Sequence, residues 1–194
     1  RALFMKLSNA ILFLIPSLIW GSTWFAIKFQ IGETDPLYSV AYRFILAGVI
    51  LYLYSKFMKL NMKFSLRNHV FMGLQGACLF GINYWLVYMA EEHLTSGLVA
   101  VVFSGLIFIN VFLNAIILKA HVRKNVLFGG FVGIVGVALI FQDELKIFDF
   151  SDQNFVAFLM AIGSVTLAST GNILSAYNQK QKIPVIQSNA YGML

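Results

Sequence analysis

Residues 10–29 read AILFLIPSLIWGSTWFAIKF, and this stretch decides the class of fold. Twenty helical residues extend about 30 Å, which is the thickness of the hydrocarbon core of a bilayer. The stretch therefore predicts a membrane-spanning helix. Its second half, residues 19–28, also holds two tryptophans, a serine, a threonine and a lysine. Polar side chains are costly in lipid, so these residues raise the question of whether one face of the helix meets protein or a polar path.

The composition extends this interpretation to the whole chain. Hydrophobic residues make up 59% of the 194 residues and charged residues 11%, with a mean hydropathy of +0.79. Soluble domains have about a quarter of their residues charged, so a water-facing domain is excluded. Further apolar runs of spanning length or slightly less follow at residues 37–55, 70–89, 96–118, 126–141 and 155–177. We expect an all-α polytopic membrane protein.

A seventh apolar run opens at Pro184. It is only eleven residues long, which covers about 16 Å of the bilayer. The predicted fold is therefore six complete transmembrane helices plus a truncated seventh, and we expect the chain to be a fragment of a longer protein. The loops between the runs are short, so sequential helices should pack as antiparallel neighbours.

The charged residues of the loops are sorted by sign. With the N-terminus placed inside, the cytoplasmic segments collect eleven of the fourteen Lys and Arg residues and no acid. The outer loops hold all eight Asp and Glu residues together with Lys146, and only Lys28 and Arg43 lie within spans. Basic residues favour the cytoplasmic side of a membrane. The map predicts a cytoplasmic N-terminus, and it explains the net charge of +6 without nucleic acid as a partner.

Residue types for catalysis or metal binding do not come together in the sequence. The three histidines, His69, His93 and His121, stand at helix ends in different loops without ligand spacing. No nucleophile has a recognisable neighbouring base, and no predicted span contains Asp or Glu. We therefore expect no enzyme activity, no metal and no cofactor. A proton relay through an intramembrane carboxylate is not expected in this portion of the chain.

The polar residues of the first span fall on one stripe. Trp20, Thr23, Trp24, Ile27 and Lys28 are spaced at i, i+3, i+4, i+7 and i+8. One interpretation places the tryptophans in an interfacial belt, with the lysine reaching to the outer surface. The other gives the stripe a cavity-lining role, since Trp20 is near mid-helix and fits the belt poorly. The residues alone leave both interpretations open.

Arg43 lies about 10 Å inside the second span, which starts near Pro36. An arginine at this depth is unfavourable by about 2–3 kcal/mol on insertion scales. It could form an ion pair with an acid of the outer loops, or grip a substrate carboxylate or phosphate through paired hydrogen bonds. Tyr42 beside it suits either an interfacial belt or a ring-stacking surface. The candidates for the ion pair are Glu33, Asp35 and Glu91.

Polar side chains recur at helical spacing in the third, fourth and sixth predicted spans. Asparagine is costly in lipid, so each such face should point at protein or water. Hydrogen bonding between helices is the commoner explanation, and lining of a cavity is the alternative. The candidates are Asn83 and Tyr84, Asn110 and Asn114, and Thr170 and Asn172. The fifth span instead has Gly129 and Gly133 in a GxxxG pattern with Gly136 a turn later, which predicts a packing face.

Three stretches carry recognisable motifs. Residues 19–51, IWGSTWFAIKFQIGETDPLYSVAYRFILAGVIL, hold a Trp-Gly-Ser motif followed by a lysine, a proline and an arginine; residues 86–106 read LVYMAEEHLTSGLVAVVFSGL and residues 128–140 read FGGFVGIVGVALI. In this order they resemble the opening, the third-to-fourth helix junction and the fifth helix of a repeat of the EamA family, in the drug/metabolite transporter superfamily. Two positions depart from the family's pattern. Phe108 stands where the family often has a proline, and His121 stands where it usually has a glutamate.

The resemblance implies a ten-helix permease of two five-helix halves inserted in opposite orientations, as in many secondary transporters. It assigns residues 9–142 to the first repeat and residues 153–194 to the truncated start of the second. The similar spacings from Asn9 to Pro36 and from Asn154 to Pro184 agree with this division. A central cavity would be lined by the first, third, fourth and sixth helices, so the polar face of residues 19–28 would border the path.

The functional hypothesis is a multi-pass permease of the bacterial inner membrane. It would be a secondary transporter that exports a small metabolite or amino acid by alternating access. Its expected partners are a small-molecule substrate and the lipid bilayer, and a homodimer is left open. The alternative is a non-transporting receptor or scaffold whose polar faces only hold helices together, although a seven-helix receptor usually has its N-terminus outside, against the charge map.

Overall fold

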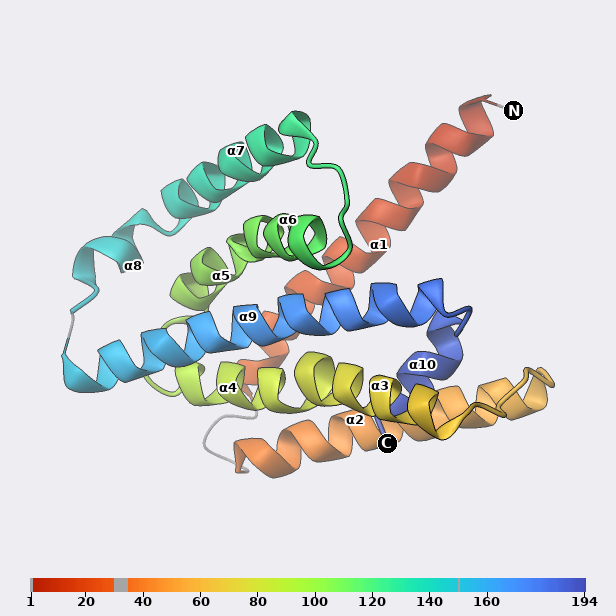
Figure 1. Ribbon diagram of the computed structural model, residues 1–194. Coiled ribbons are helices and arrows are strands. Elements are labelled where there is room, and N and C mark those ends of the chain that lie inside the picture. The colour runs from red at the N-terminus through yellow and green to blue at the C-terminus, as the bar shows by residue number, and fades with distance from the viewer. Residues whose placement is uncertain (1, 30–34, 150) are drawn as a thin grey trace. The chain divides into compact units, whose positions relative to one another are not determined.

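The computed structural model describes residues 2–29, 35–149 and 151–194, and the chain divides into two compact units, 1–35 and 36–194. Each unit is described by itself. The described residues form helices joined by loops, and no strand occurs among them (Figure 1). The predicted all-α class is therefore confirmed.

The described residues of the first unit form one helix, α1, Ala2–Lys28, whose apolar portion is Ala10–Thr23. The helix continues through Pro16. Its hydroxyl groups are satisfied within the helix, since Ser22 donates to the Ile19 carbonyl (2.8 Å) and Thr23 donates to the Trp20 carbonyl (2.6 Å). Such back-bonding lowers the cost of a hydroxyl in an apolar helix.

The second unit contains four helical stretches that are long and apolar enough to cross a bilayer. They are α2, Pro36–Phe57; the continuous run of α3, Leu66–Gly76, the π-helical η1, Ala77–Gly81, and α4, Ile82–Glu91; the pair α5, Ser96–Ser104, and α6, Leu106–Ile117; and α9, Asp152–Lys180. The remaining helices are α7, Lys124–Ile140, α8, Gln142–Ile147, and α10, Val185–Gly192. Ala10–Thr23 and Lys124–Ile140 are apolar but shorter, so the count of six complete spans stays a prediction.

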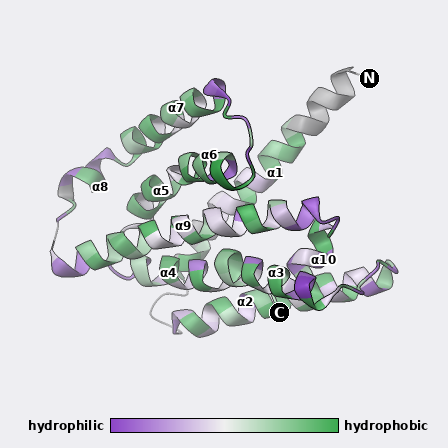
Figure 2. Cartoon of the chain, viewed as in Figure 1, coloured by the Kyte–Doolittle hydropathy of each residue, from purple (hydrophilic) through white to green (hydrophobic). Residues whose placement is uncertain are grey.

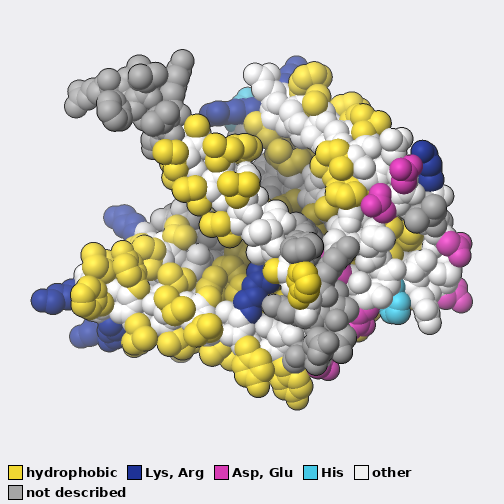
Figure 3. All heavy atoms as spheres, turned by 180° about the vertical axis from the view of Figure 1, so that it is seen from behind, with side chains coloured by type: hydrophobic (Ala, Val, Ile, Leu, Met, Phe, Trp, Pro, Cys, Tyr) yellow, Lys and Arg dark blue, Asp and Glu magenta, His cyan; other side chains and the backbone are white. Residues whose placement is uncertain are grey.

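The surface of the second unit is that of a chain surrounded by lipid. Large apolar side chains such as Leu53, Phe128 and Leu139 are exposed to 60% or more. Figure 2 shows hydrophobic residues along the helix bodies and hydrophilic residues at the helix ends and in the loops. In Figure 3 most Lys and Arg side chains lie toward one side and Asp and Glu toward the opposite side. Soluble monomers rarely expose so large a contiguous apolar surface to water, whereas such a surface is favourable in contact with lipid.

Helix α9 is the centre of the packing. It lies against α3 and α4 on one side and against α5 and α6 on another (Figure 1). Small residues allow this approach: Ala157, Ala161 and Ala168 are buried on α9, and a Cβ added at Gly171 would lie 2.8 Å from the Leu79 Cβ. Small residues at helix contacts are the usual device for packing spans, where no hydrophobic force drives them together.

The π-helical turn η1 interrupts the third span at the point where Leu79 contacts Gly171 of α9. A π turn leaves part of the regular hydrogen-bond ladder to other partners. Here the Asn83 side-chain amide donates to the Leu79 carbonyl (3.2 Å). The sequence analysis did not predict this irregularity, because its residues, ACLFG, have the composition of an ordinary apolar helix.

The glycines of α7 correct one prediction. The GxxxG pair and the glycine after it were expected to form the packing face. In the described residues, a Cβ added at Gly129, Gly133 or Gly136 would meet nothing within 4 Å. Gly130 makes the close contact instead, since its added Cβ would lie 2.8 Å from the Ile107 side chain of α6. Within this unit the predicted packing face is wrong, because α7 is rotated so that the neighbouring glycine meets α6.

Candidate functional site

Three asparagines meet between α6 and α9. Asn172 donates from Nδ2 to the Asn110 Oδ1 (3.3 Å), and Asn114 donates from Nδ2 to the Asn110 backbone carbonyl (2.8 Å). The sequence placed Asn110 and Asn114 one turn apart and left their partner open. The structure brings them together with Asn172, so three of the predicted site residues form one cluster.

A cavity of about 260 Å³ opens beside this cluster, between α6 and α7. Its polar lining consists of Asn110, Asn114, His121 and Arg123, and Ile107, Val111 and Val126 are among its apolar walls. We name it the asparagine cavity. The amide side chains lie within an apolar span, whereas the imidazole and the guanidinium come from the loop between the two helices.

The backbone explains why the loop reaches the cavity. The amides of Leu118 and Ala120 both donate to the Asn114 carbonyl at 3.1 Å, and Lys119 between them has a positive φ of 53°. This left-handed residue ends α6 and folds the chain back over its last turn. His121 and Arg123 follow at once, which places them at the rim of the cavity.

Asn83 is held in a different way. It is 3% exposed, and its Oδ1 accepts a hydrogen bond from the Ser164 hydroxyl of α9. Thr170 is satisfied by its own helix, donating to the Thr166 carbonyl at 2.9 Å. The Asn83 contact is an interhelical packing contact, and the Thr170 contact is a hydroxyl bonded to the backbone of its own helix.

A second buried set of polar side chains joins α3, α9 and α10. The Gln75 Oε1 accepts from the Asn178 Nδ2 (2.9 Å) and from the Ser188 hydroxyl (2.7 Å), while the Gln75 Nε2 donates to the Asn189 Oδ1 (2.9 Å). Gln75 and Asn178 are fully buried. We name these four residues the glutamine network. Its central residue uses both ends of its amide, which ties the third span to α9 and to the short helix α10.

Arg43 contacts the aromatic side chains of the third span. Its guanidinium lies 4.8 Å from the centre of the Tyr84 ring and 5.2 Å from that of Phe44, and it donates a hydrogen bond to the Tyr88 hydroxyl. Cation–π contacts of this kind favour a guanidinium that has left water. Of the three acids named above as possible ion-pair partners of Arg43, Glu33 lies outside the described residues.

Glu91 differs from its expected place in an exposed outer loop. It is the last residue of α4 and is 8% exposed. A buried acid at the end of a span is a functional candidate that the sequence analysis missed, because the AEEH motif reads as loop.

The other predicted residues lie apart from these clusters. Trp20 is 49% exposed on α1, and Thr23 is half-buried there. The side chains of Trp24 and Lys28 lie outside the described residues. Tyr42 is 70% exposed and stacks on Tyr38 with ring centres 6.5 Å apart.

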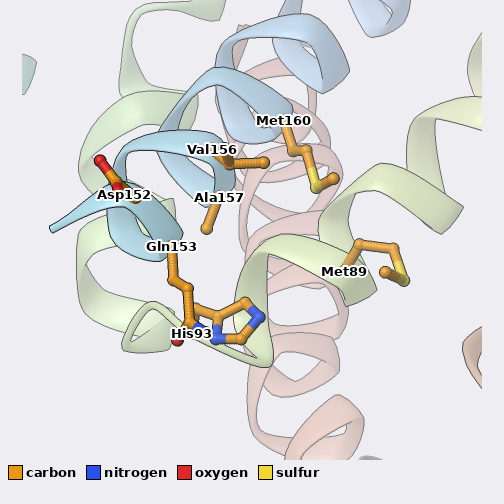
Figure 4. A pocket seen from close by; sticks show the side chains of 7 residues that line it. All are labelled: Met89, His93, Asp152, Gln153, Val156, Ala157 and Met160. Carbon is orange, nitrogen blue, oxygen red and sulfur yellow. The ribbon is translucent and has the colours of Figure 1, made fainter.

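A second cavity, of about 270 Å³, lies between the end of α4 and the start of α9 and is lined in part by Met89, His93, Asp152 and Met160. Figure 4 shows the Asp152 carboxylate pointing away from the His93 ring. Among the described residues, no group of three or more His, Cys, Asp or Glu side chains could hold a metal ion.

Comparison with known proteins identifies the family of the chain. The profile of the EamA-like transporter family matches residues 7–142, which is more than half of the chain. The chain belongs to this family. EamA-like membership, together with the apolar helices, makes it a multi-pass protein of the bacterial inner membrane.

Relatives of this EamA-like chain carry transporter names. It is 28% identical over 172 residues to the uncharacterized inner membrane transporter YedA of Escherichia coli K12, covering 87% of this chain and 52% of YedA. It is 25% identical over 184 residues to an uncharacterized transporter in the trpA 3′ region of Buchnera aphidicola subsp. Schlechtendalia chinensis, covering 93% of this chain and 58% of that protein. Protein PagO of Salmonella typhimurium is 29% identical over 101 residues, 52% of this chain and 33% of PagO.

The matched region covers a third to somewhat more than half of each of these relatives. No solved structure matches the EamA-like chain.

Several polar residues of this EamA-like chain that hydrogen-bond between helices escaped the sequence analysis, among them the buried Asn178 and Ser188 and the half-buried Asn189. Asn178 lies near the end of α9 and the other two lie in the short run after Pro184. The available signal was amide and hydroxyl side chains inside apolar runs. It indicates that a partner exists, and only the packing shows which one.

Proposed function

We propose that the chain forms part of a secondary transporter that exports a small metabolite or amino acid by alternating access. The asparagine cavity would be part of the substrate path. Family membership and the transporter names of the relatives support the transporter class. The polar clusters inside apolar spans support the placement of the path.

One observation carries this proposal. Asn110 and Asn172 hydrogen-bond to each other within spans, and Asn110 also lines a cavity of about 260 Å³. An amide that served only as an interhelical contact would not need a cavity beside it. Asn83 illustrates the contrast, since it is buried against Ser164 and lines none of the described cavities.

We infer further that residues 9–142 form the first five-helix repeat and that residues 153–194 begin the second, in a ten-helix inverted arrangement with a cytoplasmic N-terminus. The family match over residues 7–142 supports the first boundary. Under this division Asn110 belongs to the first repeat and Asn172 to the second. Their hydrogen bond would then link the two halves that must move relative to each other in alternating access.

Efflux measurements with the full-length protein test the path. We expect Asn110→Ala to slow efflux of the exported metabolite about tenfold, which corresponds to the loss of roughly 1.4 kcal/mol of interaction. Arg43→Ala and Trp20→Ala are expected to slow it less. Thr166→Ala is the matched control, because Thr166 is an exposed α9 residue bonded to its own helix. Unchanged efflux in all three variants, at normal membrane levels, would remove the site assignment.

Cysteine labelling tests the topology. Cys78, the one cysteine of these 194 residues, is first replaced by alanine together with any other cysteine of the full-length protein. A membrane-impermeant thiol reagent applied outside intact cells is then expected to label Asp143→Cys and to leave Lys59→Cys unlabelled, because the basic loops should face the cytoplasm. Labelling at Lys59→Cys in intact cells would overturn the orientation, and labelling of both only after permeabilisation would do the same.

A further inference from the structure

The asparagine cavity has a donor-rich lining. Arg123 contributes a guanidinium, His121 an imidazole and Asn110 an amide. The Asn110 Oδ1 already accepts from Asn172, and its Nδ2 donor has no hydrogen-bond partner among the described residues. Of the described residues that line the cavity, none is Asp or Glu. The lining therefore offers positive charge and N–H donors without a competing carboxylate.

We propose that this cavity binds an oxyanion, a carboxylate or phosphate group of the transported molecule, with Arg123 as the anchoring charge and Asn110 as a second donor. The inference rests on the proposed function and names its substrate class. A guanidinium presents a planar fork of donors that matches two oxygens of a carboxylate or phosphate. An amide donor deeper in the cavity would fix the orientation of the bound group.

The reach of the cavity favours a soluble ligand over a lipid headgroup. Asn110 precedes the end of α6, Ile117, by seven residues, or about 10 Å along the helix. Arg123 lies beyond that end, in the loop before α7. A ligand that touches both must extend from the rim to a depth inside the apolar span. A phospholipid headgroup remains at the membrane surface, whereas a small metabolite can enter.

A neighbouring lysine provides a control for the other role that Arg123 could have, which is to orient the chain in the membrane by its charge. Lys124 is the next residue, is also exposed, and does not line the cavity. Removing either residue removes one positive charge from the start of α7. Only removal of Arg123 removes a cavity donor.

The test measures binding rather than transport. The full-length protein in phosphatidylcholine nanodiscs is titrated with succinate, inorganic phosphate or neutral succinamide, and its thermal unfolding is followed. We expect succinate or phosphate to raise the melting temperature and succinamide to have no effect. Arg123→Gln should weaken the apparent affinity about tenfold or more, because it removes charge-assisted hydrogen bonds. Lys124→Gln should leave it unchanged.

Arg123→Lys keeps the charge of the loop but loses the planar fork, and a several-fold weakening is expected. It carries the test if Arg123→Gln does not fold. Equal affinities in Arg123→Gln and Lys124→Gln, equal stabilisation by succinamide, or no response to either anion would each overturn the proposal. Stabilisation by added phosphatidylglycerol alone would assign the cavity to a lipid headgroup and would also overturn it.

Transport is measured separately by substrate counterflow in proteoliposomes. Anion binding without counterflow of any metabolite would leave this inference standing and contradict the proposed function. Counterflow of neutral substrates without anion binding would contradict this inference and leave the proposed function standing.

Discussion

Gly76→Ala is expected to destabilise the folded protein strongly, although it adds a single methyl group. A Cβ at Gly76 would overlap the Gly192 carbonyl oxygen and lie 2.6 Å from the Gly192 Cα. Both partners are backbone, so no side chain can turn aside. Helices α3 and α10 would have to separate, and we expect a loss at the upper end of the roughly 1–3 kcal/mol typical of overpacking.

Gly73→Ala provides a control of opposite sign. Gly73 lies one turn earlier on α3, and a Cβ there would meet nothing within 4 Å. Alanine is favoured over glycine in a helix by about 0.5–1 kcal/mol, so this variant should be unchanged or slightly more stable. Unfolding of the full-length protein by sodium dodecyl sulfate in mixed micelles measures both. Equal stability of the two variants would contradict the close approach of α3 and α10.

The four spans of the second unit were predictable because length and apolar composition can be counted along the sequence. Length and apolar composition place residues 37–55 and 155–177 within α2 and α9, and no knowledge of neighbours is needed. The separation of basic loops from acidic loops was predictable in the same way, because alternate loops lie on opposite sides of a membrane. In the structure most basic side chains lie toward one side of the second unit and the acidic ones toward the other (Figure 3), with Lys146 paired to Asp143 as an exception.

The partners of the polar residues were not predictable, because they depend on how each helix is rotated. Asn83 and Asn110 look alike in the sequence, yet one is sealed against Ser164 and the other lines a cavity. The α7 glycines make the same point. A rotation by one residue separates Gly130, which packs on α6, from Gly129, which does not.

The third span shows how a local irregularity changes such a rotation. Gln75 and Asn83 are eight residues apart, which in a regular helix is about 80° away from facing the same way. The π turn between them takes one more residue per turn and reduces that offset. Both side chains consequently hydrogen-bond with α9. The π turn thus gives Gln75 and Asn83 a shared face on the third span.

Gln75→Met is expected to remove the three hydrogen bonds that Gln75 forms with α9 and α10. Methionine has a similar length and flexibility, so it fills the space while forming none of the three hydrogen bonds. Interhelical hydrogen bonds in membranes are worth about 0.6–1.7 kcal/mol each, so three of them predict a loss of roughly 2–5 kcal/mol. The Ser188 hydroxyl and the Asn189 Oδ1 would lose the Gln75 amide, and the Asn178 Nδ2 would keep only its 3.4 Å contacts with the Phe71 carbonyl and the Ser188 Oγ, which places the value toward the upper part of that range.

A double-mutant cycle separates this network from general packing. Ser188→Ala removes one of the three bonds, so Gln75→Met and Ser188→Ala combined should cost clearly less than the sum of the two single changes. Gln142→Met on the exposed face of α8 is the control and should change the free energy of unfolding little. Strict additivity of Gln75→Met and Ser188→Ala would mean that the 2.7 Å contact contributes nothing. Because Gln75 connects α3 to the segment assigned to the second repeat, strong coupling would also identify this contact as one of the points at which the two halves are held together.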